Sequence, residues 1–430
     1  MKRTVAATTL GCKVNLYDTN ALLEGFVAAG YDMVDFNDFA DVYVINTCSV
    51  TNLADKKSRQ LAGRAKRRNP QAIIAAVGCS TQANPDKFRN IGVDIIMGTS
   101  RRNELLEHVQ IFKGEQIISI ESQEYNKNYE EMSSGSDTNR TRAFLKVQDG
   151  CDNFCAYCVI PHVRGRSRSR SYNDAMTQAH NFADAGYKEI VVAGIHVASY
   201  GKDLEGQNLL ALLRDIAAIP SIQRVRLSSV EPNMITQKFC DFMAETPKFC
   251  NHLHLSLQSG SDDILRSMNR KYTAAEFEKA VEMLRSVSPD IAITTDIIAG
   301  FPGETSEHHA ETLAFLKEVK FAGLHVFPYS AKAETKAAKM GGQIAKETKT
   351  ARTKELLALG KMLNTSYAQK FLGHLTDVLI EEVRQDGRYV GKTTNYLSVN
   401  FASPIPFAQN DIVKVILEKT RDGVVCGHII

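Results

Sequence analysis

Short apolar runs alternate with amphipathic stretches along the first 110 residues of the chain. Four runs have the length and composition of buried strands, and they occupy residues 4–10, 41–47, 72–78 and 94–99. The segments between them repeat apolar residues at helical spacing. Because strands that alternate with helices are typical of a parallel sheet with crossover helices, the sequence predicts an α/β domain over residues 1–120.

A polar stretch at residues 121–142 interrupts this alternation, and its Ser-, Asn- and Glu-rich composition is typical of a linker. From residue 143 the alternation resumes with six candidate strands, at residues 143–150, 189–194, 224–232, 252–260, 291–300 and 323–330. Six βα units predict an open (βα)6 partial barrel over residues 143–366, in which the lysine-rich part from 331 to 366 is helical. Reactive groups of such sheets lie beyond the carboxyl ends of the strands.

The pattern changes once more in the last part of the chain. Short strands separated by turn residues are predicted at residues 377–383, 388–393, 396–402, 411–419 and 424–430. They indicate a small all-β module over residues 367–430. The expected fold class is therefore α/β, with an amino-terminal parallel-sheet domain, a central open barrel and a carboxyl-terminal β module.

Composition narrows the class of protein. A chain of 430 residues with 43% hydrophobic and 23% charged residues is an ordinary globular protein with several domains. No apolar run approaches the ~20 residues of a membrane span, and the apolar stretch before Cys12 is too short for a leader. Nine cysteines without a disulfide pattern fit a reducing compartment. We therefore expect a cytoplasmic protein without a membrane segment.

Three cysteines follow the first strand of the predicted barrel. Cys151, Cys155 and Cys158 form a C-x3-C-x2-C run. A structural zinc site normally needs a fourth ligand, and although His162 is near, a second C-x2-C pair is missing. Unrelated buried cysteines would rarely be spaced so tightly. An iron-sulfur cluster held by three thiolates, with one iron left open, is the favoured interpretation.

Three more cysteines occupy equivalent places in the first domain. Cys12, Cys48 and Cys79 each follow an apolar strand. The carboxyl ends of parallel strands meet at one edge of a sheet, so these cysteines are expected to converge. Any one of them alone would be read as a buried apolar residue. Three at equivalent places favour a second three-thiolate cluster.

The first cysteine run, with Tyr157 before its third cysteine, resembles the radical S-adenosylmethionine superfamily. In that superfamily the open iron binds the amine and carboxylate of S-adenosylmethionine, which is cleaved to a 5'-deoxyadenosyl radical. Two three-cysteine sets, a βα barrel and a small β module together resemble the methylthiotransferase family over nearly the whole chain. The resemblance implies two [4Fe-4S] clusters, S-adenosylmethionine as both methyl and radical source, and a TRAM-like RNA-binding module. Cys240, Cys250 and Cys426 match no family motif and are expected to pack in cores.

Four segments resemble the branch of this family that acts on threonylcarbamoyladenosine in tRNA. They are "GCKVN" at 11–15, "GIHVASYG" at 194–201, "RLSSVEP" at 226–232 and "HLHLSLQSGSDDILRSMNRKYT" at 252–273. The resemblance implies addition of a methylthio group to carbon 2 of that adenosine, 3' of the anticodon, with an electron donor of the flavodoxin or ferredoxin type and a sulfur donor as partners. Isopentenyladenosine in tRNA and a ribosomal-protein aspartate remain alternative substrates. A radical enzyme with one cluster and a non-enzymatic RNA-binding metalloprotein remain alternative functions.

Charged and aromatic residues suggest where RNA binds. The net charge of +3 alone indicates no polyanionic partner, but basic residues cluster in the predicted helix at 53–68, which is either an RNA contact or a solvated face. Alternate residues of an extended segment point the same way, which predicts a row of phosphate contacts formed by Arg164, Arg166, Arg168 and Arg170. In the β module, aromatic residues could stack on bases or pack in its core: Tyr389, Tyr396 and Phe401.

The resemblance also implies a cofactor pocket at the strand ends of the barrel. Asp296 lies in the fifth strand and Gly300 just after it, where glycine lets the backbone approach a ligand. The other pocket candidates follow the second, third, fourth and sixth strands: Gly194, His196, Glu231, Gln258, Ser259 and Tyr329. Polar residues at strand ends also cap helices and close turns.

Overall fold

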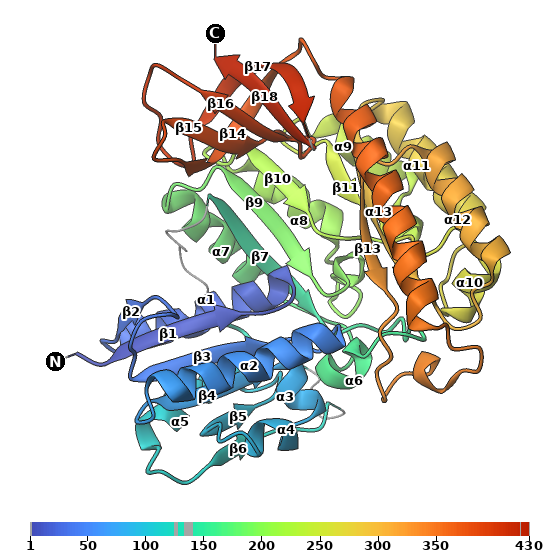
Figure 1. Cartoon of the computed structure of the whole chain (residues 1–430). Coiled ribbons are helices and arrows are strands. Elements are labelled where there is room, and N and C mark those ends of the chain that lie inside the picture. The colour runs from blue at the N-terminus through green and yellow to red at the C-terminus, as the bar shows by residue number, and fades with distance from the viewer. Residues whose placement is uncertain (1, 124–127, 133–140, 422, 430) are drawn as a thin grey trace.

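The structure is a computed structural model that describes residues 2–123, 128–132, 141–421 and 423–429. Three β-structures follow one another along the chain and lie in a row, with the open barrel in the middle (Figure 1). The amino-terminal sheet lies at the carboxyl ends of the barrel strands, and the carboxyl-terminal β-structure lies at their amino ends. The expected fold class is confirmed.

The first β-structure is a fully parallel six-stranded sheet in the order β2-β1-β3-β4-β5-β6. Its strands are β1 (Thr4–Thr9), β2 (Asp32–Val34), β3 (Val42–Thr47), β4 (Ile73–Gly78), β5 (Ile95–Met97) and β6 (Ile117–Ser119). The four predicted strands are confirmed. The two strands that the sequence did not predict, β2 and β6, lie at the edges and have three residues each, too short for a period-2 pattern.

Helices cover both faces of this sheet. On one face, α1 (Lys13–Ala28) and α5 (Leu105–Ile111) bury their apolar residues against the strands. On the other face lie α2 (Asn52–Arg68) and α4 (Asp86–Arg89), and α3 (Cys79–Ala83) directly follows β4. This is the layered arrangement that alternating strands and helices favour.

The second β-structure contains the six predicted barrel strands in chain order. They are β7 (Arg142–Asp149), β9 (Glu189–Gly194), β10 (Arg224–Leu227), β11 (His252–His254), β12 (Ala292–Ala299) and β13 (Gly323–Pro328). Parallel bridges from Val225 to Phe249 and from Val230 to Leu255 join β10 to the β11 segment. Among the described residues β13 has no pairing with β7, so the barrel is open on that side.

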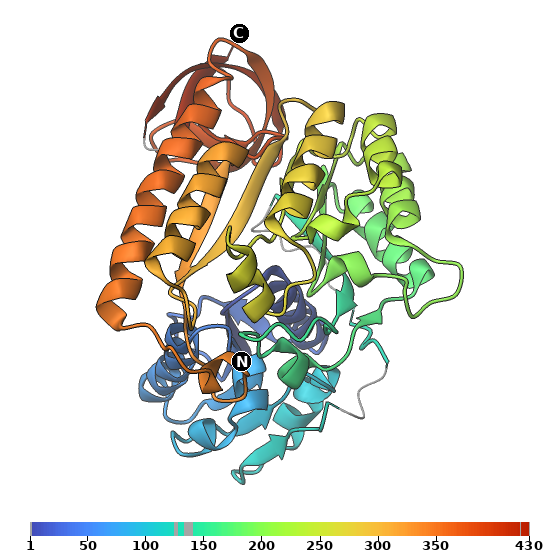
Figure 2. The same ribbon diagram turned by 90° about the vertical axis from the view of Figure 1, so that its right-hand side faces the viewer.

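The barrel helices lie outside the strands (Figure 2). They are α7 (Tyr172–Asp184), α8 (Leu209–Ala218), α9 (Gln237–Glu245), α10 (Asp262–Ser267), α11 (Ala274–Val287), α12 (Ser306–Val319) and α13 (Lys346–Gln369). A helix from residue 331 was wrong for its first part, because residues 331–345 contain only the 3-10 turn Ala337–Lys339. Gly341 and Gly342 lie just before α13, and Gly342 has a φ of +68° that a helix does not allow.

The third β-structure is a closed five-stranded barrel in the order β14-β15-β16-β18-β17. Its strands are β14 (Leu375–Val383), β15 (Arg388–Lys392), β16 (Ser398–Ala402), β17 (Ile412–Arg421) and β18 (Val424–Ile429). Tyr389 and Phe401 are buried in its core, with ring centroids 5.3 Å apart. Of the two alternatives, core packing therefore holds for these two residues.

This closed barrel is fixed to the amino ends of the central strands. Arg224 donates from Nη1 to the Lys392 carbonyl at 2.9 Å and from Nη2 to the Asp377 carbonyl at 2.8 Å. The Tyr396 ring stacks on His252 with centroids 4.7 Å apart, and the Arg226 guanidinium lies 4.8 Å from the Tyr396 centroid. Tyr396 therefore contributes to the contact between the two barrels.

Part of the predicted linker packs in the structure. Residues 124–127 and 133–140 lie outside the described residues. Between them, Met132 is buried and its carbonyl accepts a 2.6 Å hydrogen bond from the Tyr17 hydroxyl. Glu130 forms an ion pair with Arg102 at 2.8 Å. In the described part of the chain, none of the helices is long and apolar enough to span a membrane.

Candidate active site

The loop after β7 carries the first cysteine set. Gly150 has a φ of +71°, and a Cβ atom there would lie 1.9 Å from the Arg166 carbonyl oxygen, so only glycine fits. The amide of Cys158 donates to the Cys155 carbonyl at 3.0 Å, which closes a turn around the set. Burial raises the pKa of Cys151 to about 11 and that of Cys158 to about 12. These thiols need a metal or a cation nearby to be held as thiolates.

Arg270 supplies such a cation at the first set. Its Nη1 donates to Cys155 Sγ at 3.3 Å, and its Nη2 lies 2.8 Å from a Glu231 oxygen. The residue lies after α10 and its side chain is 5% exposed. Arg270 lies in the family-like segment 252–273, but nothing in its local sequence pattern indicates its approach to Cys155.

Two predicted pocket residues join the same hydrogen-bonded group. Glu231 accepts from Asn153 Nδ2 at 2.8 Å, and His196 Nε2 lies 3.5 Å from the other Glu231 oxygen. Burial would raise the pKa of Glu231, but the hydrogen bond from His196 and the charge of Arg270 outweigh it, so this pKa lies below its usual value. Glu231 is therefore held as a carboxylate beside the cysteine loop.

The remaining pocket candidates lie in three different surroundings. Gln258 and Asp296 lie side by side, because the Gln258 amide donates to the Asp296 carbonyl at 2.9 Å and an imidazole nitrogen of His254 lies 3.3 Å from an Asp296 oxygen. Ser259 is bonded to Thr312 of α12 at 3.3 Å. The others have tightly packed backbone or rings, with no contact to a cysteine sulfur recorded in the described region: Gly194, Gly300 and Tyr329.

The second cysteine set lies at one edge of the amino-terminal sheet. Cys12, Cys48 and Cys79 follow β1, β3 and β4. A Cβ atom on Gly11 would lie 2.8 Å from Cys48 Sγ, so the loop before Cys12 presses against Cys48. Burial, and then the neighbouring Cys79, raise the pKa of Cys48 to about 12. Cys12 is exposed, whereas Cys48 and Cys79 are buried.

Each set offers three thiols, and thiolates are the usual protein ligands of iron-sulfur clusters. Within residues 2–123, 128–132, 141–421 and 423–429, no group of three or more His, Cys, Asp or Glu side chains is arranged to hold one metal ion. A tetrahedral zinc site needs its ligands within ~2.0–2.3 Å of one centre. In an iron-sulfur cluster each thiolate binds a different iron atom, so the sulfurs stay farther apart.

The predicted row of phosphate-binding arginines is wrong for three of its four members. Arg164 is 0% exposed, and Arg168 and Arg170 are each 2% exposed. Arg164 ends a short helix, α6 (Ile160–Arg164), and Gly165 turns the chain with a φ of +74° before the two-residue strand β8 (Arg168–Ser169). The segment is therefore not one extended strand with a solvent-facing edge. Only Arg166, with a side chain 71% exposed, can reach a phosphate.

The buried arginines belong to a charge network between the first sheet and the barrel. Lys146 Nζ lies 2.8 Å from Asp18 and 2.7 Å from Asp149. Arg164 lies 2.9 Å from Asp149, and Arg102 pairs with Asp18. Three basic side chains thus share two buried carboxylates, with Glu130 as a third acid at Arg102. The network fixes the second cysteine set relative to the first.

The predicted basic helix, α2, has a solvent-facing row of cations. Lys56, Lys57, Arg64 and Arg67 are exposed. Arg59 pairs with Asp55 at 2.7 Å and is less exposed. The helix begins four residues after Cys48, and the Asn52 amide donates to the Ser330 hydroxyl of the barrel at 3.2 Å. An RNA contact by α2 stays a prediction.

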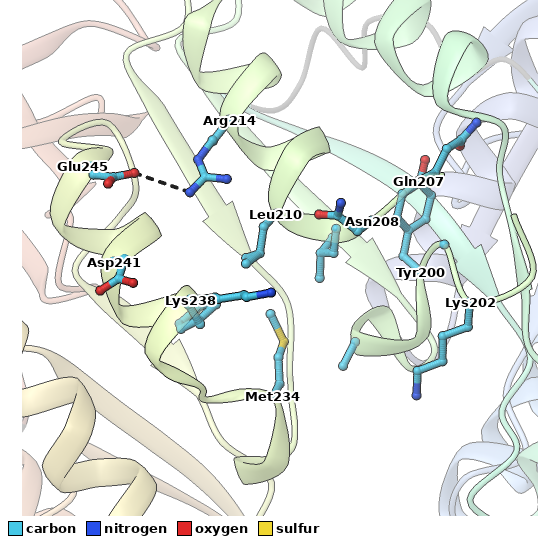
Figure 3. A pocket seen from close by; sticks show the side chains of 14 residues that line it. Tyr200, Lys202, Gln207, Asn208, Leu210, Arg214, Met234, Lys238, Asp241 and Glu245 are labelled. Carbon is cyan, nitrogen blue, oxygen red and sulfur yellow. Dashed lines mark hydrogen bonds and ion pairs between the residues drawn. The ribbon is translucent and has the colours of Figure 1, made fainter. Parts of the chain in front are cut away.

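A groove of about 690 Å³ lies beside α8 and α9 (Figure 3). Tyr200, Lys202 and Gln207 line one side of it, and Met234 and Lys238 line the other. None of the cysteines or of the predicted cofactor residues lines it. It is therefore separate from the candidate active site.

Comparisons with known proteins agree with this architecture. A model of the Radical SAM superfamily matches residues 145–316, and a model described as Uncharacterized protein family UPF0004 matches residues 4–98. Among solved structures, the radical S-adenosylmethionine methyltransferase TsrM from Kitasatospora setae has a TM-score of 0.59 at 14% identity, covering 79% of this chain and 77% of its own. This likeness shows the fold. The open barrel with its three-cysteine loop is that of a radical S-adenosylmethionine enzyme, a class that uses a [4Fe-4S] cluster and S-adenosylmethionine.

Curated relatives define the family within this class. Threonylcarbamoyladenosine tRNA methylthiotransferase MtaB from Bacillus subtilis is 43% identical over 93% of this chain and 90% of its own, and MtaB from Thermotoga maritima is 36% identical over 93% and 91%. The tRNA-2-methylthio-N(6)-dimethylallyladenosine synthase from Geotalea uraniireducens is 34% identical over 98% and 97%. The chain belongs to the radical S-adenosylmethionine methylthiotransferase family.

Proposed function

We propose that this protein adds a methylthio group to carbon 2 of N6-threonylcarbamoyladenosine next to the anticodon of tRNA. The observation that carries the proposal is the presence of two three-cysteine sets that one buried charge network connects, through Arg164 between Cys79 and Asp149. Relatives named for threonylcarbamoyladenosine reach 43% and 36% identity, and one is 34% identical, whereas the compared relative named for dimethylallyladenosine is 34% identical; the higher values support threonylcarbamoyladenosine as the substrate.

Each cysteine set is proposed to hold one [4Fe-4S] cluster. Cys151, Cys155 and Cys158 leave one iron open for S-adenosylmethionine. Cys12, Cys48 and Cys79 are proposed to hold the second cluster, which the convergence of the ends of β1, β3 and β4 supports. A second open iron would provide a place for the sulfur that is inserted.

The bound groups supply a reaction that side chains cannot perform. When bound, one S-adenosylmethionine would supply the methyl group for the sulfur, and a second, split by one electron, would supply a 5'-deoxyadenosyl radical able to take the hydrogen from carbon 2. The electron comes from a flavodoxin- or ferredoxin-type donor, and a sulfur donor restores the inserted atom.

The protein's own residues position the reactants. His196, Glu231 and Asn153 form a polar wall beside the first set, with Glu231 held as a carboxylate that suits a cationic group of the cofactor. Gln258 and Asp296 are proposed as the facing wall, completed by the glycines and rings at the strand ends. The exposed cations of α2 and Arg166 are proposed to contact tRNA phosphates. The protein is proposed to act in the cytoplasm.

Two variants test the division of labour between the cysteine sets. Cys155→Ala should abolish cleavage of S-adenosylmethionine to 5'-deoxyadenosine in oxygen-protected, reconstituted protein. Cys48→Ala should spare this cleavage and abolish thiolation, because only the second set is disrupted. Iron analysis that finds one four-iron cluster in the unmodified chain would exclude the proposed sulfur insertion.

A deletion strain tests the substrate. Mass spectrometry of its tRNA nucleosides should show threonylcarbamoyladenosine that has lost the methylthio group. Loss of the methylthio group from isopentenyladenosine instead would reassign the enzyme, and unchanged tRNA would favour the ribosomal-protein substrate.

A further inference from the structure

Each cysteine set has one sulfur that is hydrogen-bonded to a buried guanidinium. Arg270 Nη1 donates to Cys155 Sγ at 3.3 Å, and Arg164 Nε donates to Cys79 Sγ at 3.2 Å. Among the described residues these are the charged side chains with a recorded hydrogen bond to a cysteine sulfur. The same arrangement therefore occurs at both sets, although the two arginines come from different segments of the chain.

Arg270 is anchored at every nitrogen. Nε donates to the Tyr272 hydroxyl at 2.8 Å, and Nη2 lies 2.8 Å from Glu231 and donates to the Ser256 carbonyl at 3.2 Å. The remaining nitrogen, Nη1, donates to Cys155 and also to the Tyr157 hydroxyl at 3.5 Å. A guanidinium fixed in this way cannot turn from the sulfur without breaking several buried hydrogen bonds.

Arg164 is anchored in the same manner, by partners from the barrel strand β7 and from α1. Nη1 lies 2.9 Å from both Asp149 oxygens, and Nη2 donates to Asn15 and lies 3.3 Å from Asp18. Only Nε is left to Cys79. Since Asp149 lies two residues before Cys151, Arg164 also links the second cysteine set to the strand that carries the first.

We propose that Arg164 and Arg270 are positioning residues of the two metal centres: each holds one ligating sulfur in place and raises the reduction potential of the cluster bound there. Adding an electron makes a cluster more negative, so a fixed cation and N–H donor stabilise the reduced form more than the oxidised form. Both guanidinium groups are excluded from water, so solvent and salt screen their charges weakly and the effect on the potential is strong.

The Arg270 half of the inference depends only on the cluster of the radical S-adenosylmethionine class. The Arg164 half rests on the proposed second cluster. The two halves are therefore tested separately, and an absent second cluster in the unmodified chain would refute the proposed function without touching Arg270.

The test is a reduction titration followed by electron paramagnetic resonance on the full chain. To observe one cluster at a time, each arginine is changed in a background in which the other cysteine set is replaced by alanine. Arg270→Gln should make the potential of the Cys151/Cys155/Cys158 cluster more negative, and Arg270→Lys should do so by less because it keeps the charge. Arg164→Gln and Arg164→Lys should act in the same order on the other cluster.

Arg226→Lys is the matched control. Arg226 is also a buried, ion-paired arginine, 2.7 Å from Glu189, but its recorded hydrogen bonds go to Glu189 and to backbone carbonyls of residues 393 and 394. It should leave both potentials unchanged. An unshifted potential in Arg164→Gln or Arg270→Gln with full iron content would overturn the proposal for that residue.

Iron analysis and circular dichroism cover the case in which a cluster is not retained. For this purpose each arginine is also changed in the background that keeps only the other cysteine set. Loss of iron from the set next to the changed arginine but not from the other set, with the helical signal intact, supports the positioning role. Equal loss from both sets, or the same loss in Arg226→Lys, contradicts it, because the effect would then be a general loss of folding.

Discussion

Removal of one carboxylate from the buried charge network should strongly destabilise the protein. Asp18 is 0% exposed, with Lys146 at 2.8 Å and Arg164 at 3.3 Å, and it also pairs with Arg102. Asp18→Asn keeps the shape of the side chain but turns an amide donor toward groups that are themselves donors. Three cations would then face two acids, Asp149 and the less buried Glu130.

The expected magnitude follows from this imbalance. Breaking a buried ion pair by removing one partner costs about 3–5 kcal/mol, because the other charge stays buried without compensation. The control is Asp32→Asn, in which the same chemical change affects an exposed pair with Lys2 at 3.6 Å, with side chains 59% and 70% exposed. Exposed pairs contribute about 0–1 kcal/mol.

Urea denaturation of the metal-free chain under reducing conditions measures the difference. The transition of Asp18→Asn should move to clearly lower urea than that of the unmodified chain, while Asp32→Asn should barely move. Equal shifts of the two variants would refute the reasoning, since the network would then contribute no more than a surface ion pair.

Three further results are expected. Gly150→Ala should lower the iron content of the first cysteine set, because the added Cβ would lie 1.9 Å from the Arg166 carbonyl oxygen. The control is Gly92→Ala, at a similar φ of +73° but with nothing within 4 Å of the added Cβ. It should keep full iron and lose about 1–2 kcal/mol of stability. Cys240→Ala should leave the iron count unchanged, since Cys240 packs in the apolar core; a drop in iron would make it a ligand. Basic neighbours outweigh burial and hold the pKa of Asp149 in the folded protein well below its usual value of about 3.9. The Asp149 carboxylate therefore contributes fully to stability above about pH 4, and this contribution is lost as the pH falls further. Calorimetry of the metal-free chain should show a melting temperature that falls below about pH 4, and a melting temperature that rises there would contradict the assignment.

The sequence was sufficient to predict the longer strands and the positions of the two cysteine sets at their ends, because both depend on local patterns. Cys48 directly follows a strand of six buried residues, and Cys79 follows another apolar strand, so parallel pairing alone brings them to the same end of the sheet. The helix from 331 failed where the glycine pair at 341 and 342 outweighed the surrounding helix formers.

The functions of the arginines were not predictable, because their partners are distant in sequence. Alternating arginines look like a solvent-facing row, yet Arg164 binds Asp18, 146 residues away. Nothing near Arg270 in the sequence indicates a bond to Cys155, 115 residues away. Only the tertiary fold decides whether such a cation meets an acid, a sulfur or solvent.

Hydrogen bonds to backbone carbonyls hold the carboxyl-terminal barrel against the central barrel. Arg224 and Arg226 bond to backbone carbonyls of the carboxyl-terminal barrel, at residues 377 and 392–394, so that barrel has no hinge at these points. If the carboxyl-terminal barrel bound an RNA, the distance from that contact to the candidate active site would therefore be fixed. Selection among tRNAs would then depend on the distance between the modified base and the part of the tRNA bound by the carboxyl-terminal barrel, as well as on the base itself.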